Sequence, residues 1–225
     1  MPNTKSFHEV VRDRHSVRAF LPDVVPDALI RAVVEEAQLA PSNCNTQPWH
    51  VHIVSGDARD RLSAALIAAD DVDHMTLDFP FIPDAYSGAH VERLRAQGAA
   101  YYQAMGVPRE AIEERRNVMR RNLCFFDAPQ VALLFMPDTA NSVRVAGDIG
   151  MYGQTFLLSL TAHGLGGIPQ TVLGMYADTI RETLNIDPSQ KMLFGISFGY
   201  PDPDHPANVY RIDKAGLEET VTFHR

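Results

Sequence analysis

The 225-residue chain has little cysteine, no long apolar run and no excess of basic residues. Its two cysteines, Cys44 and Cys124, are too few for a disulfide framework or a four-cysteine zinc site. No stretch approaches the roughly 20 apolar residues of a transmembrane helix, and the first residues lack an apolar segment of signal-peptide type. The 28 acidic and 20 basic residues give a net charge of −8. We therefore expect a cytoplasmic protein that binds neither nucleic acid nor a membrane.

Common catalytic and nucleotide-binding motifs are also missing. The sequence has no P-loop and no His-Glu-x-x-His zinc helix. Gly164-x-Gly166 does not extend to a dinucleotide-binding fingerprint, because Pro169 occupies the place of the third glycine. His50 and His52 have no third ligand nearby in the sequence, so we predict no metal site.

Hydrophobic periodicity predicts a chain of alternating helices and strands. Ser6 and Glu9 form a capping-box pattern at the start of a helix that ends near Arg14. Further helices are expected over 26–40, from Asp57 onward, over 143–163 and over 176–184. Strands are expected over 51–55, 130–136 and 192–198, and the continuous apolar run of 130–136 is typical of a strand buried on both faces.

Glycine and proline mark three special segments. Gly147, Gly150 and Gly153 recur every third residue of the predicted helix 143–163, which predicts a bare side approached by another helix, with a second subunit as one source. The segment 164–170 is expected to be a turn that leads into a new element. The proline-rich tail from Tyr200 is expected to be extended and to wrap around another part of the assembly.

The region of about 70–120 differs in composition from the rest of the chain. It begins with an acidic stretch, continues through proline and aromatic residues, and then shows two helical patterns, over 90–105 and 108–121. Because it has too few apolar residues for a core of its own, we interpret it as a helical lid inserted into a single domain of residues 1–225.

One catalytic motif does match in its residue pattern. Residues 195–199 fit the Gly-x-Ser-x-Gly nucleophile elbow around Ser197, and Asp204 or Asp213 and then His224 follow in hydrolase order. The elbow requires a helix after the serine, however, and two closely spaced prolines follow here. A serine hydrolase is therefore an alternative hypothesis, and a buried strand is the favoured interpretation.

Two polar segments offer the chemistry of a nucleotide site. Arg14-His15-Ser16-Val17-Arg18 carries guanidinium and hydroxyl groups that can surround a phosphate, although a solvated helix end gives a similar cluster. The loop 42–47 carries neutral donors and acceptors that suit a flat heterocycle, although such groups also hydrogen-bond a loop to itself.

Taken in order along the chain, these segments resemble the nitroreductase family of FMN flavoproteins. The resemblance rests on 14–18, the helix that opens at Pro26, 40–49, 164–170, 199–201 and 208–217. The length of the insertion and the stretch 121–129 are most similar to the nitrobenzoate-reductase type.

The resemblance implies an α+β fold with a mixed β-sheet flanked by helices. It also implies an intertwined homodimer with an extended C-terminal tail and one FMN at each subunit interface. In this family the first segment and a basic tail residue hold the FMN phosphate or ribityl chain, the polar loop reaches the flavin from the other subunit, and the backbone of a third segment lies along the ring. The implied cofactor-binding residues are Arg14, His15, Ser16, Arg18, Pro41, Ser42, Asn43, Asn45, Gln47, Pro169, Gln170, Thr171, Val172, Arg211 and Lys214.

The resemblance implies that NADPH or NADH reduces the flavin at N5 and that a nitroaromatic or quinone acceptor then reoxidises it, with ping-pong kinetics and no catalytic acid or base. Thr171-Val172 departs from the Glu-Gly that members often carry, so the pocket floor is expected to differ.

Aromatic lid residues that can stack on the acceptor are Phe79, Phe81, Tyr86, Tyr101 and Tyr102. The arginines Arg115, Arg116, Arg120 and Arg121 either attract an anionic substrate or pair with Glu113 and Glu114 on a solvated face, which is the favoured interpretation. A flavin-binding protein with another task, or a dehalogenase of the same fold, stays an alternative.

Overall fold

A four-stranded sheet forms the centre of the protein, with strand order β1-β2-β4-β3. The structure is a computed structural model, and it describes residues 5–225. The strands are β1 (His50–Ser55), β2 (Gln130–Pro137), β3 (Gly166–Gln170) and β4 (Gln190–Gly199). All three strand pairs are antiparallel. An isolated parallel bridge between Ser16 and Gly167 lies along the free edge of β3 and makes the pairing mixed.

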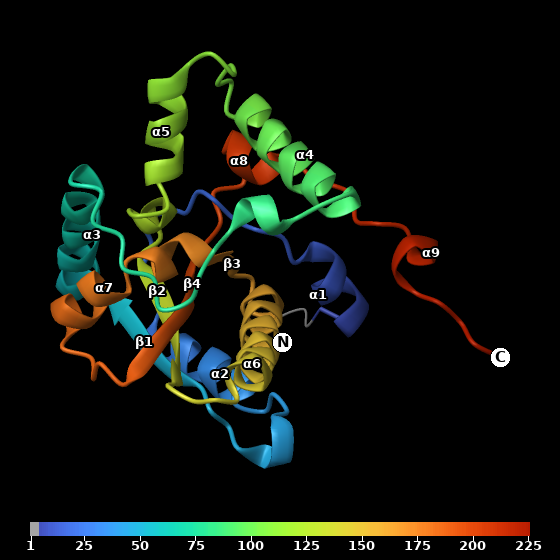
Figure 1. Ribbon diagram of the computed structural model, residues 1–225, viewed down its shortest axis with the longest axis horizontal. Coiled ribbons are helices and arrows are strands. Elements are labelled where there is room, and N and C mark those ends of the chain that lie inside the picture. The colour runs from blue at the N-terminus through green and yellow to red at the C-terminus, as the bar shows by residue number, and fades with distance from the viewer. Residues whose placement is uncertain (1–4) are drawn as a thin grey trace.

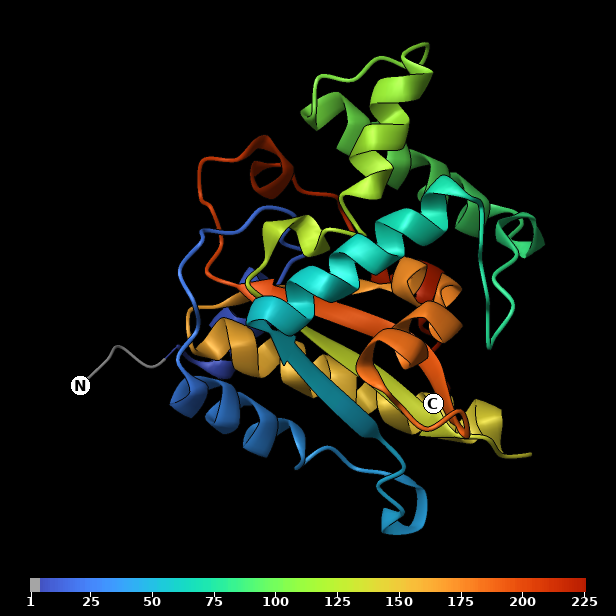
Figure 2. The same cartoon turned by 90° about the vertical axis from the view of Figure 1, so that its left-hand side faces the viewer.

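Helices cover both faces of the sheet (Figure 1). Helices α3 and α7 lie on one face, α2 and α6 lie on the other, and α4 and α5 project from one end of the body, as Figure 2 also shows. The α-helices are α1 (Phe7–Asp13), α2 (Asp27–Ala37), α3 (Gly56–Asp71), α4 (Ala89–Ala104), α5 (Ile112–Arg120), α6 (Ser142–Ala162), α7 (Ala177–Leu184), α8 (Pro206–Val209) and α9 (Leu217–Thr220). Short 3-10 turns are η1 (Asn43–Asn45), η2 (Pro83–Ala85), η3 (Phe125–Asp127) and η4 (Thr171–Met175). Within residues 5–225, no helix is both long and apolar enough to cross a membrane.

Strand β2 is buried on both faces, as its apolar run predicted. Val131, Leu133 and Phe135 pack into a cluster with α3 and α7, whereas Leu134 and Met136 pack into a second cluster with α2 and α6. This alternation follows from the two-residue period of a strand. The expected capping box is also present, since the Ser6 hydroxyl accepts the Glu9 N–H and the Glu9 carboxylate accepts the Ser6 N–H.

The turn predicted at 164–170 was incomplete, and only two of the three α6 glycines are open to a second helix, whose approach stays a prediction. The segment 164–170 is not a turn alone, because Gly166–Gln170 forms β3, and only Gly164 has a positive φ, of 77°. A Cβ on Gly166 would lie 2.5 Å from Val17 Cγ2, so this glycine permits close packing of the edge. On α6, Gly153 packs against the Phe194 ring, whereas Gly147 and Gly150 are open. Each three-residue step falls about 60° short of a full helical rotation, so the three glycines do not share one face.

The lid insertion and the tail pack on each other. Tyr101 of α4 and Val118 of α5 form a small apolar cluster with Ala207 of α8. The tail is not wholly extended, since α8 and α9 are single turns within it, and beyond α8 it runs away from the body (Figure 1). An ion pair between Arg93 and Glu219, with a 2.5 Å contact, connects α4 to α9. The tail therefore lies against the lid along part of its length.

Candidate functional site

A cationic pocket forms where the tail crosses the segment after α1. Its volume is about 420 Å³, and its lining brings together Arg14, His15, Ser16 and Arg18 with Arg211 and Lys214, about 200 residues away in the sequence. We call this pocket the cradle. Val11, Arg12, Gln97, Tyr210 and Ile212 complete its lining. All of the sequence-predicted residues from the first segment and the tail therefore meet in one place.

The cradle carries uncompensated positive charge. Five of its lining residues are arginine or lysine, and none is acidic. Within the described chain, Arg14, Arg18, Arg211 and Lys214 form no ion pair. In a protein with a net charge of −8, such a concentration of cations favours an anionic ligand such as a phosphate.

Burial lowers the pKa values of two groups in the cradle, and nearby cations add to the effect on one of them. Burial lowers the pKa of the Arg14 guanidinium, which nevertheless stays charged. Burial, together with the charges of Arg211, Arg14 and Arg18, lowers the pKa of His15. The Nδ1 atom of His15 lies 2.7 Å from the Asp13 carbonyl oxygen, so the neutral ring donates its proton there. A bound anion would relieve the repulsion between these groups.

Asn208 fixes the tail to the first segment, a role that sequence reasoning missed. Its Oδ1 accepts the Arg18 N–H at 2.7 Å, and its Nδ2 donates to the carbonyls of Ala19 and Asp202, each at 2.8 Å. These partners lie 190, 189 and 6 residues away, so no local pattern marks Asn208. The Tyr210 hydroxyl, which was also missed, accepts a 2.8 Å hydrogen bond from Arg18 Nη1.

The segment 169–172 lies along the same sheet edge as the cradle. Ser16 bridges to Gly167, and Thr171 lies four residues beyond Gly167, or about 13 Å along an extended chain. Thr171 begins η4, and the first N–H groups of a helix have no acceptor within it. The Gln170 side chain points into the protein, where Nε2 donates to the Asn122 carbonyl at 3.0 Å and Oε1 accepts from Ser197. Gln170 is thus buried, whereas its neighbours Pro169 and Thr171 are exposed.

The loop 41–47 is exposed and conformationally strained. Cys44, Asn45 and Gln47 have φ values of 50°, 57° and 46°, which non-glycine residues rarely adopt. The loop is held by hydrogen bonds from the Asn43 N–H to Asp148 of α6 and from the Gln47 N–H to the Ser42 hydroxyl. The side chains of Pro41, Asn43 and Gln47 remain exposed. Strain held in an exposed polar loop is typical of a functional contact.

Within a single chain, the loop 41–47 lies far from the cradle. The loop contacts α6 at Asp148, near its N-terminal end, whereas the first segment lines a second pocket together with Thr161, at the other end of α6. Thirteen helical residues span about 20 Å. Figure 1 shows the same separation, with η1 at the bottom of the view and α1 and α4 above it. The two halves of the predicted site are therefore far apart within one chain.

The aromatic residues of the lid divide into covered and exposed rings. The Arg18 guanidinium lies 4.9 Å from the centre of the buried Tyr101 ring, and Arg115 lies 3.5 Å from the centre of the Tyr102 ring. Phe79 packs against the core cluster that contains α2 and α6. Phe81 and Tyr86 are exposed.

The expected partners of the lid arginines were wrong, because these arginines pair across elements instead of along their own helix. Arg116 and Arg120 approach Asp70 at 4.0 and 3.1 Å, and Arg120 also pairs with Asp71. Arg121 pairs with Asp127, and Arg115 has no carboxylate partner among the described residues. Among residues 5–225, no ion pair to Glu113 or Glu114 is formed, and for Arg116 and Arg120 the end of α3 offers the carboxylates instead.

The structure does not support a nucleophilic role for Ser197. The residue is fully buried in β4, and its hydroxyl donates to Gln170 Oε1. No helix begins directly after β4, where a nucleophile elbow requires one, because Pro201 forms an antiparallel bridge with Phe20 and α8 begins only at Pro206. His224 lies near the end of the tail, which leaves the body (Figure 1). Within residues 5–225, no group of three or more His, Cys, Asp or Glu side chains could hold a metal ion.

Comparison with known proteins places this geometry in one family. The family model described as "Nitroreductase family" matches residues 11–200. Nitroreductase NfnB of Mycolicibacterium smegmatis is 45% identical over 216 residues, which cover 96% of this chain and 92% of the relative. A 4-nitrobenzoate reductase of Pseudomonas putida is 33% identical, covering 94% of this chain and 92% of the relative. The crystal structure of the FMN-dependent NfnB from Mycobacterium smegmatis in complex with NADPH superposes with a TM-score of 0.93 over 97% of both chains, at 45% identity. The chain therefore belongs to the nitroreductase family.

Proposed function

We propose that this protein is an FMN-dependent oxidoreductase that transfers two electrons at a time from NADPH or NADH to nitroaromatic acceptors, and also to quinones, by a ping-pong mechanism. The relatives described as nitroreductases and nitrobenzoate reductases, and the solved FMN-dependent, NADPH-bound structure, support this proposal. When bound, FMN supplies the hydride chemistry itself. Reduction of a nitro group to a nitroso group consumes one reduced nicotinamide and one proton and releases one water.

The observation that carries the proposal is the cradle. An FMN phosphate is a tetrahedral anion, and the arginines, the Ser16 hydroxyl and Lys214 provide the charged and polar donors that bind such a group. Because His15 is neutral, the positive charge that binds the phosphate comes from the guanidinium and ammonium groups. From the cradle, the flavin end would extend along β3 toward Pro169–Val172, where the Thr171 N–H is available as a donor.

The loop 41–47 reaches this flavin from a second copy of the chain. Beside the polar Arg144 and Gln154, the outward face of α6 carries Val143, Gly147, Gly150 and Met151, and Val143 is 86% exposed. An apolar stripe on an otherwise buried helix is typical of a subunit interface. Two copies related by a twofold axis through this stripe pack their α6 helices antiparallel. That arrangement moves the loop of one copy toward the cradle end of the other, so we propose a homodimer.

The lid supplies the acceptor side of the site. Phe81 and Tyr86 keep exposed rings, and we propose that they stack on the aromatic acceptor. Tyr101 and Tyr102 are covered by arginines and position those arginines instead. The two free cysteines, Cys44 and Cys124, fit the reducing environment of the cytoplasm, where we place the protein.

The first test is the visible spectrum of the purified protein and the identity of what a denaturant releases. We expect flavin bands, about one FMN per subunit, a dimer by light scattering, and parallel double-reciprocal plots with NADPH and a nitroaromatic. Arg14→Gln should weaken FMN binding, whereas Arg31→Gln, on the exposed side of α2, should not. A colourless protein that takes up no FMN would contradict the proposal. Bound FMN without turnover of nicotinamide and nitroaromatic would favour a flavin protein or dehalogenase of the same fold.

A further inference from the structure

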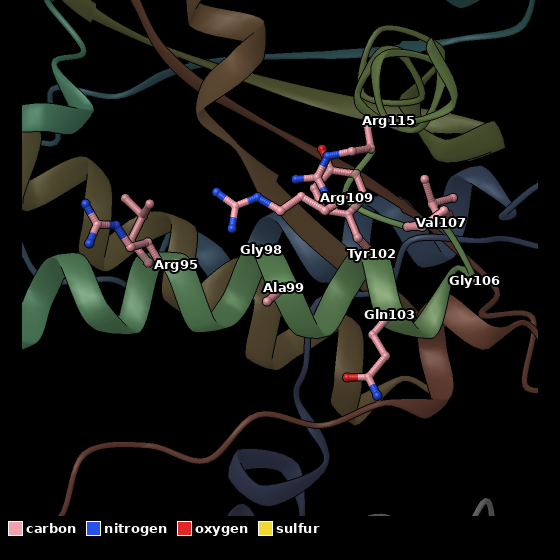
Figure 3. Close-up of a pocket in the computed structure, with 11 residues that line it drawn as sticks. Arg95, Gly98, Ala99, Tyr102, Gln103, Gly106, Val107, Arg109 and Arg115 are labelled. Atoms are coloured by element: carbon pink, nitrogen blue, oxygen red, sulfur yellow. The ribbon is translucent and has the colours of Figure 1, made fainter. Parts of the chain in front are cut away.

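A large cavity lies within the lid and is separate from the cradle. It is a groove of about 940 Å³ between α4 and the segment that leads into α5. Figure 3 shows Arg95, Arg109 and Arg115 around it, with Gly98 and Tyr102 on the α4 side. We call it the lid groove. Its lining contains three arginines and no acidic residue.

The charges of the lid groove are the unpaired arginines of the insertion. Each of the other insertion arginines has a carboxylate partner: Arg93 with Glu219, Arg116 and Arg120 with Asp70, and Arg121 with Asp127. Within residues 5–225, Arg95, Arg109 and Arg115 form no ion pair, although Glu110, Glu113 and Glu114 are close to them in sequence. The three unpaired cations therefore gather on one cavity, which is the pattern expected for an anion-binding site.

The rest of the lining suits a flat ring. The Arg115 guanidinium lies over the Tyr102 ring, 3.5 Å from its centre, and both side chains line the groove. Gly98 leaves the α4 wall bare, since a Cβ built there meets nothing within 4 Å. Val107 and Pro108 add apolar surface. A planar heterocycle that carries phosphate groups matches both parts of this lining.

The lid groove lies beside the cradle on the same helix. Gln97 and Tyr101 face the cradle, as Gln97 lines it and Tyr101 lies under Arg18, whereas Gly98 and Tyr102 line the groove. Successive helical residues differ by about 100°, so α4 separates two neighbouring sites. A ligand in the groove thus lies next to the proposed flavin site but does not compete for the cradle.

We infer that the lid groove binds the phosphorylated adenosine end of NADPH, and that Arg95, Arg109 and Arg115 set a preference for NADPH over NADH. This inference rests on the proposed function. The shared chemistry is an aromatic ring with an anionic substituent, and a carboxylated aromatic acceptor has it too. The groove favours the nucleotide, because one arginine satisfies a carboxylate, whereas three match an adenosine with phosphates on two positions. A volume of about 940 Å³ also suits a nucleotide better than a single substituted benzene ring.

The test uses the FMN-loaded protein and two variants that disturb the groove differently. Arg109→Gln removes a cation, and Gly98→Leu fills the groove while retaining every charge. Gly98→Leu also replaces a helical glycine in open space, so the fold should tolerate it. Arg116→Gln is the matched control, since Arg116 neighbours Arg115 but pairs with Asp70 at 4.0 Å and does not line the groove. Circular dichroism checks that each variant is folded.

The first readout is binding of adenosine 2′,5′-bisphosphate by calorimetry, which does not depend on turnover. We expect the Kd to rise about tenfold or more in both groove variants, as for the loss of a charge-assisted contact or of the space itself. Arg116→Gln should bind like the wild type. Unchanged binding in Arg109→Gln and Gly98→Leu, or an equal loss in Arg116→Gln, would overturn the inference.

The second readout is the ratio of kcat/KM for NADPH to that for NADH with an uncharged nitroaromatic. We expect the ratio to fall about tenfold in Arg109→Gln and to stay at the wild-type value in Arg116→Gln. If the ratio is constant while 4-nitrobenzoate loses its advantage over nitrobenzene, the groove binds the acceptor and the inference is wrong. If the wild type oxidises neither nicotinamide, the proposed function fails, and the calorimetry alone then decides whether the groove binds the nucleotide.

Discussion

Replacement of Asn208 by alanine should detach the tail from the cradle. Asn208 is only 5% exposed, and its amide makes three hydrogen bonds, two to Arg18 and Ala19 in the segment after α1 and one to Asp202 within the tail. The Ala19 carbonyl would keep one partner, since it also accepts the Asp202 N–H at 3.1 Å. The Arg18 N–H and the Asp202 carbonyl would both lose their side-chain partner.

The expected cost follows from these atoms. Leaving a buried donor or acceptor unsatisfied costs about 1–3 kcal/mol, and the loss of a satisfied hydrogen bond costs about 0.5–1.5 kcal/mol. Two groups of the first kind and one of the second give a loss of about 2–5 kcal/mol in the free energy of unfolding, after some rehydration of the opened site. Because Arg211 and Lys214 follow directly in the chain, FMN should also bind at least about tenfold more weakly.

Urea unfolding followed by circular dichroism measures the first effect, and fluorescence titration of the apoprotein with FMN measures the second. Protein concentration is held constant, because a dimer couples stability to association. Val209→Ala is the matched control, since Val209 is 62% exposed and its truncation should change stability by less than about 0.5 kcal/mol. Asn208→Asp tests the hydrogen bonds separately from packing. It conserves the shape of the side chain, but it replaces the amide nitrogen that donates to two carbonyls by a carboxylate oxygen, which can only accept. A mild effect of Asn208→Asp, together with a large effect of Asn208→Ala, would refute the hydrogen-bond reasoning.

Three further outcomes are expected. Lys214→Gln should weaken FMN binding several-fold and make the binding less sensitive to salt. Titrations with FMN at two ionic strengths measure both effects, and an unchanged salt dependence would show that Lys214 does not bind the phosphate. Burial and nearby cations lower the pKa of His15 in the chain without FMN. This pKa should be higher with FMN bound, because a phosphate anion favours the imidazolium. NMR titration with and without FMN measures the pKa, and an equal or lower value with FMN would contradict the prediction. A serine-directed phosphonate should not label Ser197, and labelling seen by mass spectrometry would revive the hydrolase hypothesis. Ser197→Ala should lower the free energy of unfolding by about 1–3 kcal/mol, because it leaves Gln170 Oε1 without its donor.

Local rules accounted for most elements of the fold. The capping box at Ser6, the apolar run of β2 and the helical period of α6 each depend on neighbouring residues, so their elements were predicted within a few residues. Strand β3 was not predicted, because its glycines suggested a turn. Its conformation is set by pairing with β4 and by the close approach of Val17, which only the folded chain provides.

The site shows the same division between local and long-range information. The sequence by itself determined the chemistry of the site: the residue types of 14–18 suit an anion, and the family resemblance implied the basic tail residue and the absence of a catalytic acid or base. Only the tertiary structure decided the geometry. It brought Arg18 to Asn208, 190 residues away, paired Arg120 with α3, and left three arginines of the lid groove without an ion pair to any residue of 5–225. Ion pairs and side-chain to backbone hydrogen bonds depend on distances between segments remote in the chain, and these distances are fixed only when the core packs.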